Sequence, residues 1–389
     1  MKITHVSLCG PVTDNFSYQD NLLPKYHKKI GFDVSMITSK YIWDKGNISI
    51  DNRDIYLNEY GIKTIRLENK KKTTIHSKFK RYHNLYETLS NEKPDILFIH
   101  GVQFLDVRNI VSYLDKNPQV KVYVDNHADF SNSATNWLSK NILHKILWRR
   151  MAKIVEPYTE KFYGVLPSRV DFLNEIYKIP KEKIELLVMG ADDEKVENTI
   201  SLKLGEEVRT RYGITDEEFL IVTGGKIDNA KRQTLLLMEA VKNITNMKIK
   251  LIVFGSVTPE LKEEFMSLVD GKKVQYVGWI ESSDSYQYFA SADLAVFPGG
   301  HSVLWEQVVA QGVPLVVKQG ENMSHIDFDG NIKFLQENTY EEIYDLLLEI
   351  VSDKRLYKKM KNASQKNRKH FMYSNIARKS LELDVEYHV

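Results

Sequence analysis

The chain has 389 residues, of which 42% are hydrophobic and 11% aromatic, a composition typical of globular proteins. Its 54 Lys and Arg residues nearly balance 52 Asp and Glu residues, and the resulting net charge of +2 excludes a strongly basic nucleic-acid-binding protein. The length exceeds what one hydrophobic core normally serves, so we expect two domains of roughly two hundred residues each.

The amino-terminal half alternates short β-rich runs with helical patterns, which is typical of a parallel α/β sheet. The run ITHVSL is followed by Leu22, Tyr26 and Ile30 at helical spacing, and then by the run DVSMIT. Three further strands are predicted at DILFIH (95–100), VKVYVD (120–125) and GVLP (164–167). This half is therefore predicted to form a doubly wound domain.

The same alternation begins again after the sequence GADD at 190–193. Helix signals separate its strands: Thr258 before Pro259 fits the first two positions of a helix, and Thr339 with Glu342 fits a capping box. Five strands are predicted at FLIVTGG (219–225), KLIVFG (250–255), VQYVGW (274–279), LAVFP (294–298) and PLVVK (314–318). A second doubly wound domain follows from this pattern.

Two lysines follow the first strand of the second half, in the sequence GGKIDNAKRQ. Lys226 and Lys231 lie in a loop that leads into a helix, and open α/β sheets bind ligands at the carboxyl ends of their strands. A departing nucleoside diphosphate gains negative charge, which fixed ammonium groups and helix amino-terminal N–H groups can stabilise without a metal. The alternative is that both are ordinary exposed lysines.

A glycine pair ends another predicted strand, in FPGGHSVLWEQVVAQGVPLVV at 297–317. Gly299 and Gly300 allow the backbone to approach a phosphate or a sugar hydroxyl closely. A helix is predicted to open at about Ser302, which places Glu306 one turn inside it. Its carboxylate could accept two hydrogen bonds from ribose hydroxyls, or it could merely compensate the helix dipole.

With these motifs the chain resembles glycosyltransferase family 4, retaining enzymes found in bacterial surface-polysaccharide biosynthesis. The stretch from Gly225 to Lys231 is similar to the family's Gly-Arg-x5-Lys motif, with Lys226 in place of Arg, and Glu306 with GVP at 312–314 is similar to its Glu-Ala-x-x-x-Gly-x-Pro. The resemblance implies the GT-B fold, an α/β arrangement of two Rossmann-like domains facing a central cleft.

The resemblance also implies a division of the chain into parts. Residues 1–190 would form the acceptor-binding domain, 191–365 the nucleotide-sugar-binding domain, and 366–389 a helix that returns to the first domain.

The resemblance carries over roles for individual residues. Gly225, Lys226 and Lys231 would bind the diphosphate, the two lysines also serving catalysis, and Glu306 would bind the ribose. The family's additional glutamate, eight positions earlier, is absent because Pro298 stands there. The donor sugar would then contact the residues of the intervening loop, namely Gly299, Gly300, His301 and Ser302.

In the first half, His127 of VYVDNHADF matches a histidine that the family places near the donor sugar, where it would take part in catalysis. His100, at the end of DILFIH, has similar geometry. The loop after the first strand lies where the family contacts sugars, and Asp14, Asn15 and Gln19 are the candidates there; a capping loop without a ligand is the alternative.

We expect neither a cofactor nor a metal, because the nucleotide-sugar is a substrate and the lysines replace a cation. The sequence DFD at 327–329 matches an Asp-x-Asp pattern that binds Mg²⁺ or Mn²⁺ in another glycosyltransferase class. Gly330 and Asn331 follow it, so a turn is the better interpretation.

A cytoplasmic location is expected, because Cys9 is the single cysteine and the start MKITHVSLCG lacks the features of a signal peptide. The segment 136–153 combines Trp137, Trp148 and aliphatic residues with several basic residues. This composition suits peripheral contact with the inner face of an anionic membrane, although a helix buried between neighbours is the alternative.

The leading hypothesis is therefore a metal-independent, retaining hexosyltransferase. It would use a UDP-sugar, with a GDP-sugar as the other candidate, and a glycan or lipid-linked acceptor. Two alternatives share the fold: a non-catalytic GT-B subunit that binds a glycan or a partner enzyme, and a sugar-nucleotide epimerase. The missing glutamate favours the first alternative, and the second would need acids and bases that the sequence does not assign.

Overall fold

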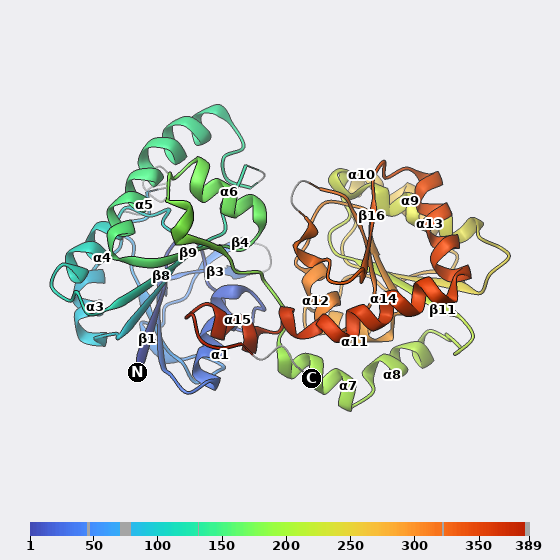
Figure 1. Ribbon diagram of the computed structural model, residues 1–389, viewed down its shortest axis with the longest axis horizontal. Coiled ribbons are helices and arrows are strands. Elements are labelled where there is room, and N and C mark those ends of the chain that lie inside the picture. The colour runs from blue at the N-terminus through green and yellow to red at the C-terminus, as the bar shows by residue number, and fades with distance from the viewer. Residues whose placement is uncertain (45–46, 71–78, 131, 321–322, 386–389) are drawn as a thin grey trace. The chain divides into compact units, whose positions relative to one another are not determined.

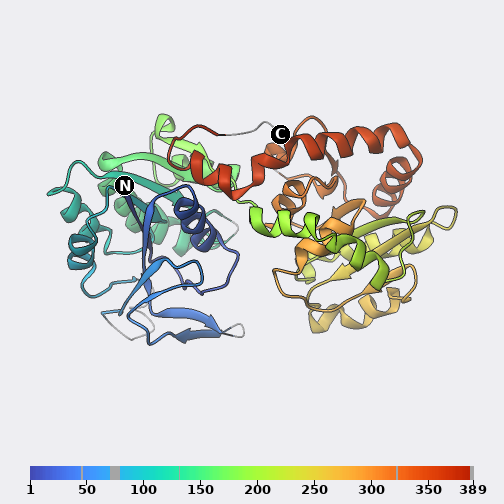
Figure 2. The same ribbon diagram turned by 90° about the horizontal axis from the view of Figure 1, so that it is seen from below.

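A computed structural model describes residues 1–44, 47–70, 79–130, 132–320 and 323–385 of the protein (Figure 1). The chain divides into two compact units. The first contains Met1–Met189 together with Ile376–Val385, and the second contains Gly190–Asn375. Each unit is a sheet with helices on both faces, as Figures 1 and 2 show.

The first unit is built on an eight-stranded sheet in the order β10-β9-β8-β7-β1-β2-β6-β5. All neighbouring strands run parallel except β5, which is antiparallel to β6. The strands are β1 (Lys2–Ser7), β2 (Asp33–Ser39), β5 (Ile55–Leu57), β6 (Lys63–Leu67), β7 (Ile96–His100), β8 (Lys121–Asn126), β9 (Thr159–Gly164) and β10 (Ile184–Leu186). A separate hairpin pairs β3 (Tyr41–Asp44) with β4 (Asn47–Ile50).

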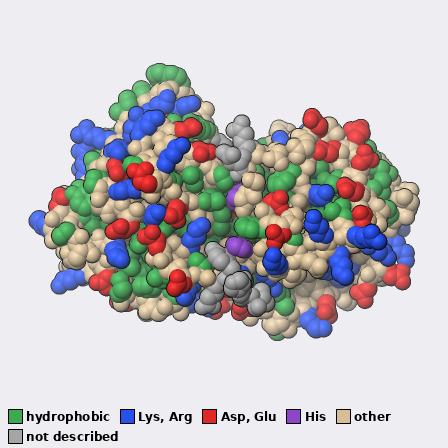
Figure 3. Space-filling model, viewed as in Figure 1, with side chains coloured by type: hydrophobic (Ala, Val, Ile, Leu, Met, Phe, Trp, Pro, Cys, Tyr) green, Lys and Arg blue, Asp and Glu red, His purple; other side chains and the backbone are tan. Residues whose placement is uncertain are grey.

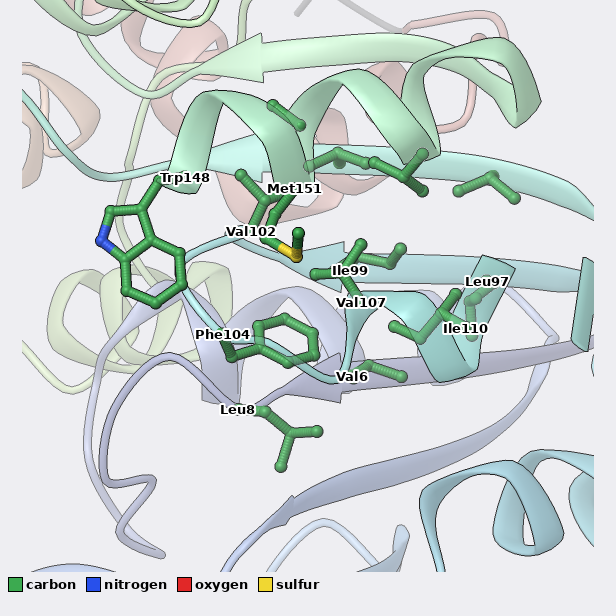
Figure 4. Packing of buried hydrophobic residues seen from close by; sticks show 14 of the residues in the cluster. Val6, Leu8, Leu97, Ile99, Val102, Phe104, Val107, Ile110, Trp148 and Met151 are labelled. Carbon is green, nitrogen blue, oxygen red and sulfur yellow. The ribbon is translucent and has the colours of Figure 1, made fainter. Parts of the chain in front are cut away.

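The central strands of this sheet are buried on both sides, since helices cover both faces of the sheet. On one face Val6, Ile99 and Phe104 pack against Met151, as the close view in Figure 4 shows. The helices are α1 (Gln19–Lys29), α3 (Leu85–Glu92), α4 (Val107–Leu114), the π-helix η1 (Ser139–Trp148), α5 (Arg149–Val155) and α6 (Pro167–Glu175).

The second unit is built on a six-stranded, fully parallel sheet in the order β13-β12-β11-β14-β15-β16. The strands are β11 (Phe219–Gly224), β12 (Ile249–Phe254), β13 (Val274–Tyr276), β14 (Leu294–Phe297), β15 (Leu315–Lys318) and β16 (Ile332–Leu335). The helices are α7 (Asp193–Ser201), α8 (Leu204–Arg211), α9 (Gln233–Asn243), α10 (Pro259–Leu268), α11 (Ser285–Ser291), α12 (Leu304–Ala310), α13 (Tyr340–Ser352) and α14 (Lys354–Asn367). The predicted α/β architecture with parallel sheets is confirmed.

Several local predictions are corrected. The run GVLP at 164–167 is not a strand: β9 ends at Gly164, and Pro167 begins α6. Thr258 precedes α10 as predicted, but its side chain makes no capping hydrogen bond. The capping box is half formed: the Thr339 hydroxyl accepts a hydrogen bond from the Glu342 backbone N–H at 3.3 Å, but the Glu342 carboxylate accepts from backbone N–H groups that precede Thr339. Strands β5, β6, β10 and β16 were missed because they are short and weakly patterned.

The end of the chain crosses from one unit to the other at Ile376, ten residues later than the sequence boundary of 366. Helix α14 extends to Asn367 and buries Met360 in the core of the second unit, which explains why the chain stays there so long. Helix α15 (Tyr373–Lys379) contains the crossing point.

Candidate functional site

Two glycines bring the loops after β11 and β12 into backbone contact in the second unit. Gly225 has a φ of 108° and Gly255 a φ of 114°, a region that side-chain-bearing residues rarely adopt. A Cβ on Gly255 would lie 1.9 Å from the Gly225 carbonyl oxygen. The close approach therefore depends on glycine at this edge of the sheet.

The two predicted lysines in the loop after β11 have different environments. Lys226 is exposed, with 66% of its side chain accessible, and its ammonium lies 3.4 Å from an Asp228 carboxylate oxygen. Lys231 is partly buried, and its side chain lies over Gly299, where a Cβ would meet Lys231 Cγ at 2.7 Å. The structure thus brings Lys231, but not Lys226, against the glycine loop that follows β14.

Burial is the main reason why the pKa of Lys231 lies below its usual range, and the nearby charge of Lys226 lowers it further while Asp228 opposes the change. Among the described residues, the Lys231 ammonium forms no hydrogen bond and no ion pair. An unpaired, partly desolvated cation of this kind is ready to bind an anion.

The loop after β14 contains the residues predicted to contact the donor sugar. Gly299 is buried beneath Lys231, whereas Gly300 is exposed with open space around its Cα. The Ser302 hydroxyl accepts a hydrogen bond from the Leu304 backbone N–H at 3.4 Å, so Ser302 helps to start α12, two residues after the predicted opening.

Glu306 is fully buried and held by two histidines. Its Oε1 lies 2.9 Å from His301 Nε2 and 3.3 Å from His325 Nε2. Its other oxygen, Oε2, is buried without a hydrogen-bond partner among the described residues, as is the indole N–H of Trp305. An unsatisfied buried carboxylate oxygen is costly, which is consistent with a site that a ligand hydroxyl completes.

The two histidines also keep Glu306 ionised. Burial by itself would raise the pKa of Glu306, but the charges and hydrogen bonds of His301 and His325 outweigh it and lower the pKa to about 2. An ionised carboxylate is a strong acceptor for hydroxyl groups. The exposed, dipole-compensating role considered for Glu306 does not describe this buried geometry.

A cavity of about 800 Å³ lies in the first unit, at the carboxyl ends of its central strands. Its charged and titratable lining consists of Cys9, Asp20, Lys80, His100, His127 and His144, and Trp148 contributes an aromatic wall. The Ser7 hydroxyl donates a hydrogen bond to Asp20 at 2.5 Å, and Lys80 donates one to the Cys9 carbonyl. The mixture of polar groups with one aromatic side chain suits a hydroxyl-rich ligand.

The loop residues predicted for sugar contact do not line this cavity. Asp14 accepts hydrogen bonds from Arg53 at 2.8 Å and from the Tyr56 hydroxyl at 3.0 Å. The Asn15 backbone N–H donates to Glu59, and the Gln19 side chain donates to Asp125 at 3.0 Å. Internal partners therefore occupy the Asp14 carboxylate and the Gln19 side-chain nitrogen, whereas the Gln19 side-chain oxygen has no hydrogen-bond partner among the described residues.

His127 lines the cavity, with 36% of its side chain exposed, and its place near a donor sugar stays a prediction. Its Nε2 lies 3.3 Å from Asp125 Oδ2, and the same oxygen lies 2.8 Å from His100 Nδ1. Burial would raise the pKa of Asp125, but His100 and His127 together hold it well below its usual range. Asp125 is therefore an anion beneath the cavity.

Both histidine–carboxylate groups have the composition of transition-metal sites. The shortest nitrogen-to-oxygen distance is 2.8 Å in the His100 group and 2.9 Å in the His301 group, and both are ordinary hydrogen-bond lengths. Two ligands of a tetrahedral zinc ion, with bonds of about 2.0–2.1 Å, lie about 3.3 Å apart. The geometry fits hydrogen bonding better, and metal independence stays a prediction.

The DFD sequence forms a turn, as predicted. The Gly330 backbone N–H donates to Asp327 at 3.2 Å, and Asp329 adopts a positive φ of 59°. The Asp329 carboxylate pairs with Lys366 at 2.9 Å, so the two carboxylates serve the turn and an ion pair.

Sequence reasoning missed Asp20, Lys80, Asp125 and His325 as site residues. Asp125 stands two positions before His127 in the strand that was already singled out, so its place at the strand end was an available signal. His325 lies in a short 3-10 helix (Ser324–Ile326) and Lys80 in a loop, neither with a motif, and only folding brings them to their sites.

Two doubly wound units, each with polar groups at the ends of its strands, give the chain the GT-B fold. Solved structures with this fold align over nearly the whole chain. A glycosyltransferase from Rickettsia africae matches with a TM-score of 0.69 at 16% identity, covering 98% of this chain and 97% of that one. HepE from Anabaena, solved with UDP and glucose, matches with a TM-score of 0.63 at 12% identity, covering 98% of each chain.

A UDP-GlcNAc 2-epimerase from Neisseria meningitidis, bound to UDP-GlcNAc, matches with a TM-score of 0.63 at 13% identity, covering 98% of this chain and 99% of that one. Residues 204–367, which lie in the second unit, match the family model of glycosyl transferases group 1. An uncharacterized glycosyltransferase from Methanocaldococcus jannaschii is 22% identical over 147 residues, which is 36% of this chain and 38% of that relative.

Proposed function

We propose that the protein is a retaining glycosyltransferase that moves a hexose-type sugar from a nucleotide diphosphate to a glycan or lipid-linked acceptor. UDP is the favoured nucleotide and GDP is the other candidate. The observation that carries the proposal is the juxtaposition of a partly buried, unpaired Lys231 with the glycine loop leading to Glu306. Surface-polysaccharide assembly at the inner face of the cell membrane is the proposed setting.

Each part of the donor has a complementary group in the second unit. Lys231 would stabilise the diphosphate as its charge grows on departure, with Lys226 and the Gly225 backbone beside it. The free Oε2 of Glu306 would accept hydrogen bonds from the ribose hydroxyls. The loop of Gly299, Gly300, His301 and Ser302 would then contact the sugar.

The acceptor hydroxyl would attack from the face that the diphosphate leaves, and a donor phosphate oxygen would take its proton. The cavity of the first unit would hold sugar groups, with His127 as a hydrogen-bonding partner. No metal is part of this proposal, because Lys231 supplies the positive charge.

A sugar-nucleotide epimerase is the second candidate function, and the residues that line the cavity of the first unit support it. Asp20 and His127 line that cavity and are groups of the kind that move protons, which the sequence alone did not provide. The two functions differ in their requirement for an acceptor: an epimerase changes UDP-GlcNAc by itself, whereas a transferase releases the nucleotide when a sugar acceptor is added. A chain that binds nucleotide but does neither would be the non-catalytic subunit.

A thermal-stability screen of UDP-, GDP- and ADP-sugars tests the proposal. At about 100 times its dissociation constant the correct donor adds about 2.7 kcal/mol, which raises the melting temperature by about 5–10 °C. We expect the same rise in the presence of EDTA and with added Mn²⁺, because lysine replaces the cation. Absence of stabilisation by all three donors would refute nucleotide-sugar binding, and stabilisation abolished by EDTA would refute metal independence.

A membrane-facing surface in the first unit is also proposed. Trp148 and His144 of η1 are buried, so the expectation of a helix packed in the core holds for one side of the segment 136–153. The other side is exposed, with 72% of Trp137 and 63% of Ile146 accessible. Figure 3 shows hydrophobic and basic side chains together at this end of the unit. No described helix is long and apolar enough to cross a membrane.

We expect Trp137→Ser combined with Ile146→Ser to weaken binding to anionic phospholipid vesicles at least tenfold. Burying one such side chain in an apolar environment is worth about 1.5–3 kcal/mol, and only part of that is gained at an interface. Co-sedimentation with vesicles measures the effect. The matched control is Ile200→Ser with Leu202→Ser, which removes two exposed aliphatic side chains of the second unit. Equal losses of vesicle binding in both variants would contradict the assignment of the membrane-facing surface to the segment 136–153.

A further inference from the structure

A chain of hydrogen-bonded histidines runs through the core of the first unit to the floor of its cavity. His5 of β1 is central: its Nε2 lies 2.9 Å from His27 Nδ1 of α1, and its Nδ1 lies 2.9 Å from His100 Nε2 of β7. His100 Nδ1 then lies 2.8 Å from Asp125 Oδ2 of β8. All four side chains are buried, and His100 lines the cavity.

The end of this histidine chain that is farthest from the cavity, at His27, contacts the carboxy-terminal segment of the protein. His27 Nε2 lies 3.1 Å from the Ala377 carbonyl oxygen and 2.9 Å from the Ser380 hydroxyl oxygen. The Ser380 hydroxyl donates its own proton to the same carbonyl at 2.8 Å. A carbonyl oxygen can only accept, so His27 Nε2 must carry a proton to interact favourably with it.

When the Ala377 carbonyl is the terminal acceptor, counting protons along the histidine chain shows that three neutral imidazoles are not enough. Four links need a proton: carbonyl to His27, His27 to His5, His5 to His100, and His100 to Asp125. A neutral imidazole carries one N–H, so three rings supply three protons. Because both ends of the chain are acceptors, the fourth proton must reside on one of its members.

The contacts of Asp125 decide which member holds it. Asp125 Oδ2 also accepts a hydrogen bond from the Gln19 side chain at 3.0 Å. An oxygen that lies in hydrogen-bonding contact with both His100 and the Gln19 amide is best satisfied as a carboxylate oxygen that accepts from both. The additional proton therefore belongs on the neighbouring ring, that of His100.

We propose that His27, His5 and His100 form a proton-ordered relay that keeps His100 doubly protonated beside ionised Asp125, so that the Asp125 carboxylate is held as a fixed negative charge 3.3 Å from His127 Nε2. His5 and His27 are then positioning residues. Only the contact of a ligand with His127 rests on the proposed function.

The electrostatic environment agrees with this assignment. Burial lowers the pKa of His5 and lowers that of His27 to about 3, so both rings are neutral. Burial also acts to lower the pKa of His100, but Asp125, with a smaller contribution from Asp20, outweighs it and the pKa is raised. The remaining groups that face this end of the relay are His127, Cys9 and Lys80.

The opposite proton order is the competing arrangement. If Ser380 donated its proton to His27, every ring could be neutral, with the proton on Nδ1 of each. That order would leave the Ala377 carbonyl facing a nitrogen lone pair at 3.1 Å. The two arrangements assign different tautomers to His27 and His5 and a different charge to His100, which a spectrum can distinguish.

Nitrogen-15 NMR of the full-length protein with labelled histidines tests the proposal directly, because the two ring shifts distinguish an imidazolium from each neutral tautomer. At about pH 8, well above the ordinary histidine pKa of about 6.5, we expect an imidazolium at His100 and Nε2-protonated neutral rings at His5 and His27. A spectrum with three neutral, Nδ1-protonated rings at these positions would overturn the proposal.

Two variants sharpen the test. Ser380→Ala keeps the carbonyl acceptor, so the His100 imidazolium should persist, whereas the opposite order predicts a change of tautomer at His27. His27→Phe removes one ring and two links, so His100 should lose its imidazolium signature at about pH 8. His83→Gln is the control, because His83 is exposed and does not belong to the histidine relay. Persistence of the signature in His27→Phe would show that Asp125 alone holds the proton.

The spectrum does not depend on any activity. If the donor screen fails while the His100 imidazolium is present, the proposed function is wrong and the relay stands. If the donor binds while His100 is neutral, the relay is wrong and the proposed function stands.

Discussion

Replacing Lys231 by alanine is expected to slow sugar transfer about 100- to 1,000-fold while nucleotide binding changes little. The Lys231 ammonium lies at the glycine loop with no hydrogen-bonding partner among the described residues, so its interaction with a diphosphate strengthens as negative charge develops. Removing one preorganised donor from such a site costs about 2.7–4 kcal/mol of transition-state stabilisation. Single-turnover transfer rates and donor titrations measure the two quantities separately.

Lys226 and Lys262 provide graded controls for this variant. Lys226→Ala should have a smaller effect than Lys231→Ala, because Lys226 is largely exposed and already paired with Asp228. Lys262→Ala removes an exposed lysine of α10 and should leave the rate unchanged. Normal turnover of the Lys231 variant with unaltered nucleotide binding would remove this loop from the catalytic site and favour the non-catalytic alternative.

Glu306→Gln should weaken donor binding about 10- to 100-fold with little change in turnover. The free Oε2 of Glu306 is proposed to accept from ribose hydroxyls, and hydrogen bonds to charged groups contribute about 1.5–3 kcal/mol. The ribose is bound equally in the ground and transition states, so the loss should be seen in the Michaelis constant of the donor. Steady-state kinetics over a wide donor range measures this.

Because Glu306 is buried against His301 and His325, the variant also needs a check of its fold. Its circular dichroism and melting curve should be compared with those of Glu341→Gln, a change at an exposed glutamate of α13. A folded Glu306→Gln protein with an unchanged Michaelis constant but reduced turnover would place Glu306 at the reacting sugar instead of the ribose.

The hydrophobic pattern was sufficient to predict most of the strands that form the two sheets. Runs such as LIVFG and ILFIH are apolar at consecutive positions, which is what a parallel strand buried on both faces requires. Short strands such as β10 and β16 were not predicted, since three or four residues with partly buried side chains carry little pattern. Their place in the sheet depends on neighbours that are distant in the sequence.

The candidate site was predictable only where its residues are close together in the chain. The glycine turns, Lys231 and Glu306 all belong to segments that follow strands in recognisable motifs, and each motif sets its own local geometry. His325 is nineteen residues from Glu306 along the chain, and the intervening sequence, which includes the rest of α12 and strand β15, carries no pattern that predicts their contact. The partial burial of Lys231 also arises only when the loop after β14 packs against it.

By itself, the sequence determined the alternation of strands and helices, the glycine turns and the chemical types of the groups at the strand ends. The tertiary structure alone decided which of those groups meet. Strand order places β1, β7 and β8 side by side, and their register pairs His100 with Asp125 although twenty-five residues separate them. Such contacts arise because burying apolar surface fixes the neighbours of each strand, and the polar groups at their ends must then satisfy one another.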